Sequence, residues 1–258
     1  MNGIISIRGR AVAMLAGLLA AFAGAAVAAD RIYTVGVENL DYYPVYAVKD
    51  GHYSGYAREV LDAFAKERGY RFEYKPFPVN RLFATFFQGQ VDFKFPDNPY
   101  WQSDLRTGKN VVYSGSVVTY VDGALVRPEL KDATPDKIKT LGTVAGFTPW
   151  AWLERIKSKQ VTLRENTSFT ALAQQVAAKR VDAAYASVAV LNYQLDNVLK
   201  MPGALVFNSK LPHSRDSYFL STLKYPEVIA EFDAWQKNHQ DFIHALKKKH
   251  GVEKGVAE

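Results

Sequence analysis

The chain has 258 residues, of which 48% are apolar and 22% are charged, with a net charge of +6 and no cysteine. This length allows one large domain or two small ones, and the apolar fraction is sufficient for a hydrophobic core. The ordinary charge content argues against intrinsic disorder. The lack of cysteine excludes disulfides, thiol catalysis and cysteine metal sites.

The first segment, residues 1–29, has the pattern of an export signal. A short basic stretch precedes an apolar, alanine-rich run that ends in an A-x-A cleavage pattern at 26–28. We expect cleavage, a mature chain that begins at Ala29 or Asp30, and a periplasmic location; a retained membrane anchor is the alternative. No later run approaches the roughly twenty apolar residues of a membrane span, so we expect no stable membrane insertion after cleavage.

In chain order, the first half of the mature chain alternates predicted strands and helices. Asp50-Gly51 is typical of a tight hairpin turn. The apolar stripe of 55–69 and the glycine at its end indicate an amphipathic helix. The predicted strands are 31–37, 71–77, 91–95 and 111–113, and the predicted helices are 55–69 and 79–88.

The second half repeats this alternation and ends in a helical tail. Ser168 and Ser187 are candidate helix caps. The predicted strands are 117–126, 141–144, 160–163, 180–185, 204–207 and 218–223, and the predicted helices are 136–139, 150–157, 168–178, 188–199 and 226–249. The whole pattern predicts two α/β units of similar size. Because no flexible linker divides them, we expect the chain to cross between the units at 114–119 and 206–211, and these segments to act as hinges.

One stretch, Gly89 to Gly115, stands out as a candidate ligand site. A short apolar run feeds a loop that carries Asp97, Asn98, Tyr100, Trp101 and Arg106. Ligands of open α/β sheets bind beyond the carboxyl ends of strands, which is where this loop falls. An ordinary surface loop is the alternative.

The basic run at 246–254 closes the last predicted helix, where cations complement the helix dipole. We interpret it as a solvated helix end and expect no nucleic-acid partner. The five histidines show no metal spacing. We therefore expect no metal and no cofactor.

Several segments in order resemble a known family. They are Tyr42-Tyr43-Pro44, DGHYSGYAREVLDAFAKERG, NRLFATFFQGQVD, VVYSGSVV, LGTVAGFTPW, KRVDAAYASVAVLNYQL and the C-terminal helices. Together they resemble the extracytoplasmic solute-binding proteins of the polar amino-acid class, family 3, with the type II periplasmic binding fold. The resemblance implies an α/β fold of two lobes, each a mostly parallel sheet flanked by helices, joined by a two-strand hinge. Lobe one is expected at 30–115 and 211–258, and lobe two at 116–210.

The resemblance also implies site residues. Tyr42 holds the place of an aromatic residue that stacks on the ligand. Gly146 and Thr148 partly match the segment that binds the ligand carboxylate. Arg106 comes closest in sequence position to the family's arginine that binds this carboxylate. The family's amine-binding acid is replaced by Ser187, five residues after Asp182. An ordinary α-amino acid ligand is therefore in doubt, unless Asp97 has taken over that role.

Our site hypothesis is a cleft between the lobes that takes a small polar or aromatic solute, because aromatic faces favour a cationic or ring-bearing ligand. Delivery to an ABC-type importer through its permease is the expected function, for a monomer that is not an enzyme. The alternatives are a periplasmic accessory or sensor protein of the same fold, and a cyclic-acid dehydratase-like enzyme using Asp97 or Glu38. The expected ligand-binding residues are Tyr42, Arg81, Asp97, Asn98, Tyr100, Trp101, Arg106, Thr148, Trp150 and Ser187.

Overall fold

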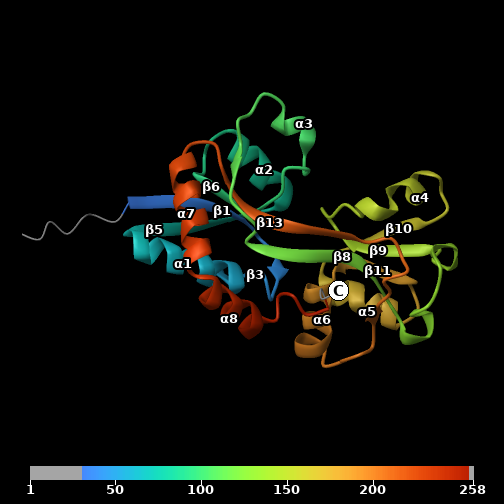
Figure 1. Ribbon diagram of the computed structural model, residues 1–258. Coiled ribbons are helices and arrows are strands. Elements are labelled where there is room, and N and C mark those ends of the chain that lie inside the picture. Colours follow the sequence, from blue (N-terminus) through green and yellow to red (C-terminus); the bar gives the residue numbers. More distant parts are fainter. Residues whose placement is uncertain (1–30, 256–258) are drawn as a thin grey trace, which may run out of the picture. The chain divides into compact units, whose positions relative to one another are not determined.

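The computed structural model describes residues 31–255, and the signal peptide predicted at 1–29 lies outside them. A curled sheet runs through this part of the chain, with helices on its faces (Figure 1). None of the helices in 31–255 is long and apolar enough to cross a membrane.

The strand bounds are as follows. The strands are β1 (Arg31–Glu38), β2 (Asp41–Tyr42), β3 (Tyr46–Lys49), β4 (His52–Ser54), β5 (Tyr70–Phe77), β6 (Phe93–Asp97), β7 (Val112–Tyr113), β8 (Val118–Val126), β9 (Thr140–Val144), β10 (Thr162–Asn166), β11 (Ala183–Ser187), β12 (Val206–Phe207) and β13 (Ser214–Thr222).

The helices alternate with these strands. The α-helices are α1 (Tyr56–Arg68), α2 (Val79–Phe87), α3 (Ser103–Arg106), α4 (Leu153–Lys157), α5 (Phe169–Ala177), α6 (Val188–Tyr193), α7 (Pro226–Asn238) and α8 (Gln240–His250). Short 3-10 turns occupy Pro128–Leu130, Pro135–Lys137 and Trp150–Trp152, and a π-helical turn, Gln194–Val198, extends α6.

The main sheet has the strand order β10-β9-β11-β8-β13-β6-β1-β5. The two ends of this order are parallel, β5-β1-β6 on one side and β10-β9-β11 on the other. The long strands β8 and β13 pair antiparallel between them, and β13 continues from β8 onto β6. These two strands therefore connect the halves of the sheet, as Figure 1 shows.

A separate small sheet, β2-β3-β4, projects from the end of β1. Its β3–β4 hairpin turns at Asp50 and Gly51, which both have positive φ (50° and 76°). The hairpin predicted at this Asp-Gly pair is confirmed, because this backbone geometry is the one that Asp-Gly accepts readily.

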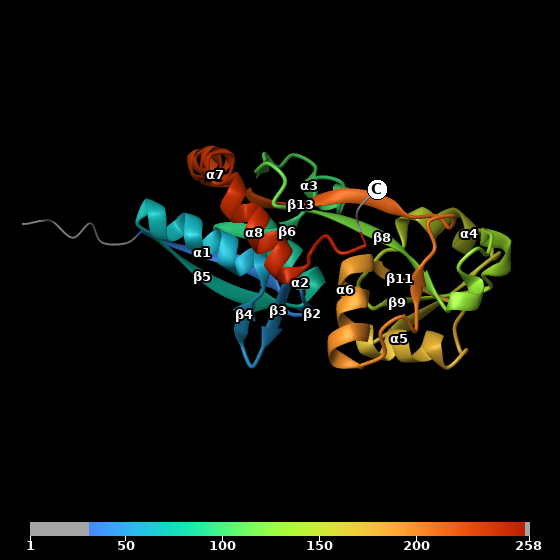
Figure 2. The same cartoon turned by 60° about the horizontal axis from the view of Figure 1, so that its bottom comes forward.

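Helix packing follows the apolar stripes of the sequence. In α1, Val60, Leu61 and Phe64 are fully buried, and Gly69 ends the helix in the left-handed conformation. Helix α8 packs beside α1 (Figure 2), so the end of the chain returns to the half of the sheet that holds β1 and β5.

Some details differ from the sequence predictions. Ser168 accepts a hydrogen bond from the Ala171 amide as a helix cap, but the Ser187 hydroxyl makes no such bond although it stands at the N-cap of α6. Phe242, an apolar residue of the helix predicted at 226–249, is 41% exposed, because this helix is divided into α7 and α8 at His239. The loop at 98–109 contains the one-turn helix α3, which its mixed polar pattern does not indicate.

Candidate functional site

A cleft lies where the carboxyl ends of β1 and β6 face the loop that follows β9. It encloses about 630 Å³, including solvent at its mouth. One wall comes from β1, the β2–β3 hairpin, α2 and the loop after β6, and the other from β8 and the β9–α4 loop. Its lining residues are Glu38, Tyr42, Tyr46, Val79, Phe83, Pro96, Trp101, Gln102, Asp122, Gly146, Phe147, Thr148, Trp150 and Tyr218.

Some of the predicted site residues meet in this cleft and others do not. Tyr42, Trp101, Thr148 and Trp150 line it, and Gly146 lies beside Thr148. The remaining predicted positions lie outside the lining, namely Arg81, Asp97, Asn98, Tyr100, Arg106 and Ser187.

The cleft is built around a stack of aromatic rings. Tyr42 stacks on Phe147 from the opposite wall, with ring centroids 5.6 Å apart and planes inclined by 13°. On its other side Tyr42 stacks on Tyr46 at 5.0 Å, and the series continues through Tyr53 to Tyr74. Offset ring pairs of this kind add stability beyond the burial of their area. The contact of Tyr42 with Phe147 thus brings together segments from the two walls.

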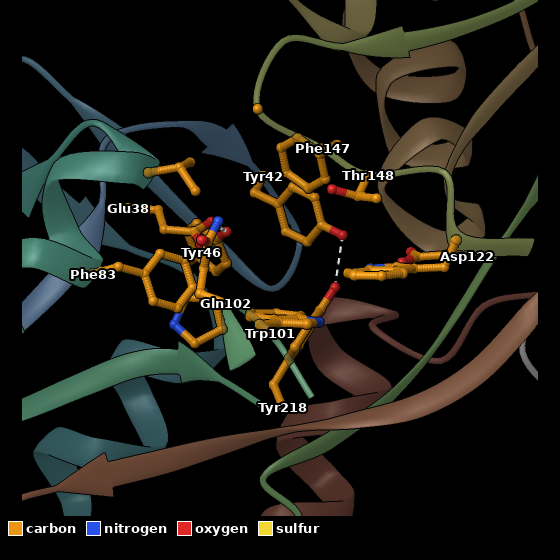
Figure 3. A pocket seen from close by; sticks show the side chains of 14 residues that line it. Glu38, Tyr42, Tyr46, Phe83, Trp101, Gln102, Asp122, Phe147, Thr148 and Tyr218 are labelled. Atoms are coloured by element: carbon orange, nitrogen blue, oxygen red, sulfur yellow. Dashed lines mark hydrogen bonds between the residues drawn. The ribbon is translucent and has the colours of Figure 1, made fainter. Parts of the chain in front are cut away.

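Tyr42 also anchors the floor of the cleft by a hydrogen bond. Its hydroxyl lies 2.7 Å from the Tyr218 hydroxyl, drawn as the dashed line in Figure 3. Tyr218 in turn stacks on Tyr120, with centroids 4.1 Å apart. Burial raises the pKa of Tyr42 well above its usual value, so the ring stays neutral and can donate or accept one hydrogen bond at the cleft floor.

The charged residues of the loop after β6 pair with one another behind the cleft. The fully buried Asp97 carboxylate accepts hydrogen bonds from Arg106 Nη2 at 2.6 Å, Lys94 Nζ at 3.1 Å and Ser221 Oγ at 2.6 Å. Arg106 also donates to the Asn98 carbonyl and to the Tyr113 hydroxyl. A guanidinium with these bonds is already matched to a carboxylate, so Arg106 has little free capacity for a ligand anion.

Lys94 is buried completely and lies 4.1 Å from the centre of the Phe83 ring, in cation–π geometry. Burial lowers the pKa of Lys94, while the charges of Asp97 and Glu38 raise it. Burial likewise raises the pKa of Glu38, which lines the cleft and accepts a hydrogen bond from the Tyr46 hydroxyl. Glu38, Lys94, Asp97 and Arg106 form a buried charge cluster with equal numbers of acids and bases.

Asp122 is the acid of the opposite wall, on β8. Figure 3 shows it beside Thr148, across the cleft from Glu38 and Phe83. Its Oδ1 atom is buried without a hydrogen-bond partner in the described part of the chain. Burial, and then the negative charge of Asp216, raise the pKa of Asp122 to about 7. The cleft therefore holds a carboxyl group that lacks a compensating charge.

The predicted residues outside the lining have other surroundings. Arg81 is exposed on α2, and Tyr100 is 75% exposed. Asn98 is buried and donates its side-chain amide to the Ser217 carbonyl, which fixes the loop onto β13. Ser187 is buried at the end of β11, and its hydroxyl has no hydrogen-bond partner among residues 31–255.

Sequence reasoning missed Asp122 and Phe147 in the second wall, and Tyr46 and Tyr218 in the ring stack. Asp122 is an acid within the otherwise β-rich run of 117–126, a signal that was present in the sequence. Tyr46 and Tyr218 have no such local signal, because they reach the cleft through the hairpin and the returning strand. Phe147 stands between Gly146 and Thr148, which were expected at the site, but was not itself expected to bind the ligand.

The strand order and the cleft between its halves define the fold as the two-lobed type II periplasmic-binding-protein fold, which confirms the predicted fold class. No protein-family model matches the chain, and no curated protein matches it significantly in sequence. The likeness to solved structures is therefore one of fold.

Three of these structures show that proteins of different kinds share this fold. A substrate-binding protein of an ABC uptake transporter from Streptococcus pneumoniae, with bound histidine, is similar at 20% identity and TM-score 0.66, over 85% of this chain and 92% of that chain. An ancestral amino-acid-binding protein, described as a precursor of cyclohexadienyl dehydratase, is similar at 20% identity and TM-score 0.65, over 85% and 95%. A histidine kinase sensor domain is similar at 18% identity and TM-score 0.66, over 86% and 96%.

Proposed function

We propose that this chain is an exported receptor that binds a small solute in the cleft and delivers it to an ABC-type importer. The observation that carries the proposal is the cleft itself, whose walls come from two halves of the sheet that β8 and β13 connect. We take lobe one as 30–115 with 211–258 and lobe two as 116–210. A solute between the lobes would contact both and favour their closed arrangement.

The lining suits a solute with a flat or apolar body. Trp101, Phe147 and the half-exposed Trp150 offer ring surfaces, while Thr148 and Gln102 offer hydrogen-bonding groups near the mouth. Pockets that combine several rings with a few polar groups fix both the shape and the orientation of a ligand. The amino-acid-binding proteins of the same fold support solute binding in general.

Binding is tested by thermal unfolding of the mature chain, residues 30–258, against amino acids, amines, organic acids and aromatic solutes. A solute that binds only the native state at 100 times its Kd adds about 2.7 kcal/mol to the free energy of unfolding, which is readily detected. The variant Trp150→Ala serves as the site control and should reduce the shift. The absence of any shift across the panel would overturn the solute-receptor proposal.

Delivery needs a separate test, because binding alone does not distinguish an importer from a sensor. Uptake of a labelled form of the solute should fall in cells that lack this gene and recover when it is restored. Unchanged uptake together with solute binding would favour the sensor function, for which the histidine kinase sensor domain of the same fold is the supporting comparison.

An enzyme is the second alternative, and one feature keeps it testable. Glu38 lines the cleft with a raised pKa, as a general acid requires. Incubation of the protein with each solute that binds, followed by mass analysis, separates the two functions. Recovery of unchanged solute is expected for a receptor, and a product that disappears in Glu38→Gln would establish catalysis.

A further inference from the structure

The two carboxyl groups of the cleft, Glu38 and Asp122, differ in their hydrogen bonds and in the charges near them. Glu38 accepts a hydrogen bond from Tyr46 and lies within the field of the Lys94 ammonium. Among residues 31–255 the Asp122 Oδ1 atom is buried with no hydrogen-bond partner, and the charge of Asp216 that acts on this carboxyl group has the same sign. A buried carboxylate oxygen without a donor is unfavourable, so Asp122 is the group in the cleft that gains most from a bound cation.

Asp122 is held rigidly at this place by the sheet. It stands in β8 directly opposite Ser187 of β11 and Ser214 of β13. Both neighbours are small and uncharged, so neither supplies a counter-charge from the ladder. A side chain placed by a central strand of the sheet also has less freedom to move away from the cleft than one on a loop.

Tyrosine rings surround this carboxyl group. Tyr120 stands two residues before Asp122 on the same face of β8, and Tyr185 stands two residues before Ser187, the residue of β11 opposite Asp122. Tyr120 stacks on Tyr218, whose hydroxyl bonds that of Tyr42. These rings surround the carboxyl group with apolar surface, and in such surroundings a carboxylate gains a charge-assisted hydrogen bond from a bound cation.

The lining of the cleft, as described for residues 31–255, has no cationic side chain that could bind an anionic ligand. Its lining residues include no lysine, arginine or histidine. Lys94 and Arg106, the two buried bases behind it, are both bonded to Asp97. A ligand carboxylate in this cleft would meet Glu38 and Asp122 and would lose its water without gaining a counter-charge.

From this arrangement we infer that the solute is a small organic cation without a carboxylate, an amine or a guanidine on an apolar or ring-bearing body, and that Asp122 binds its cationic nitrogen. This inference rests on the proposed solute-receptor function and names the chemistry of that site. The ring-bearing body lies against Phe147 and Trp101, and the nitrogen lies toward β8.

The test compares amines with the amino acids that differ from them by one carboxylate. Calorimetric titration of the mature protein uses tyramine and tyrosine, histamine and histidine, and agmatine and arginine. At least one amine should bind on the order of 10-fold or more tightly than its amino acid, because the extra carboxylate of the amino acid would lose its water beside Glu38 and Asp122 without gaining a counter-charge. Tighter binding of the amino acids overturns the inference but leaves the receptor function standing.

Variants then identify the residue. Asp122→Asn keeps the shape of the side chain and should lower the affinity for the preferred amine at least tenfold. The affinity for a neutral ring compound such as 4-ethylphenol should stay the same. Asp216→Asn is the matched control, because it removes a neighbouring acid that does not line the cleft, and it should leave amine affinity within about threefold. Equal amine affinity in Asp122→Asn and wild type overturns the role of Asp122. The absence of binding by every solute, with intact unfolding transitions, overturns the receptor function as well.

Discussion

Replacing Asp97 by Asn should destabilise the protein strongly, because this carboxylate neutralises a base that water cannot reach. The side chains of Asp97 and Lys94 are both fully buried, and their charged atoms lie 3.1 Å apart. Arg106, only 10% exposed, bonds the same carboxylate at 2.6 Å. Removing the negative charge leaves Lys94 and Arg106 close together with Glu38 as the remaining acid of the cluster.

The magnitude follows from the burial. Breaking a buried ion pair by removing one partner costs about 3–5 kcal/mol, because the other charge remains desolvated. An exposed pair has no comparable penalty, since water solvates the charge that remains. Lys210 and Asp132 form such a pair, with contact at 2.6 Å and side chains more than 60% exposed.

Urea unfolding of the mature protein, followed by circular dichroism, measures the effect. Asp97→Asn should lower the unfolding midpoint markedly at an unchanged slope, while Asp132→Asn should leave the midpoint where it is. Adding Lys94→Met should make the Asp97→Asn change less costly, because the unpaired ammonium is then absent. If Asp97→Asn behaves like Asp132→Asn, the buried charge cluster does not stabilise the fold as argued.

Three further outcomes are expected. Since the pKa of Asp122 is raised from 3.8 to about 7, its stabilising contribution is complete below pH 4 and is lost as the pH rises through 7. The free energy of unfolding of the wild type minus that of Asp122→Asn should accordingly fall by up to about 4 kcal/mol between pH 4 and pH 7. A difference that stays constant with pH would contradict the assigned environment of Asp122. Gly55→Ala should lower stability by about 1–3 kcal/mol in thermal unfolding, because φ is 104° and the added Cβ would lie 2.8 Å from the Tyr46 Cα. Trp150→Ala, at a side chain that is 51% exposed, should weaken a ring-bearing solute several-fold without changing the melting temperature; a lower melting temperature with unchanged affinity would instead assign Trp150 to packing.

The fold was largely predictable because its signals are local. The apolar stripe of α1, the Asp50-Gly51 turn and the Ser168 cap each depend on a few neighbouring residues. The boundaries of β6 and β11 are later than predicted, since their last residues are buried polar groups that hydropathy patterns assign to loops. Burial of Asp97 and Ser187 depends on partners far away in the sequence.

The site was less predictable for the same reason. Trp101 of the loop after β6 lines the cleft, but Asp97 and Asn98 turn toward Lys94 and the Ser217 carbonyl. No spacing rule shows whether a polar side chain at a strand end turns toward solvent or toward a buried base. The acid that does face the cleft, Asp122, lies in a strand that was assigned only a structural role.

The position of β13 has a consequence for the order in which the sheet can form. This strand lies between β8 and β6 at the centre of the sheet, yet it is the last of the strands in 31–255. As long as residues 214–222 are not in place, β6 lacks its neighbour on that side and strands β5-β1-β6 and β10-β9-β11 are not joined into one sheet. Contacts between residues so far apart in sequence form slowly. The two halves of the sheet can therefore join only when nearly the whole chain is available.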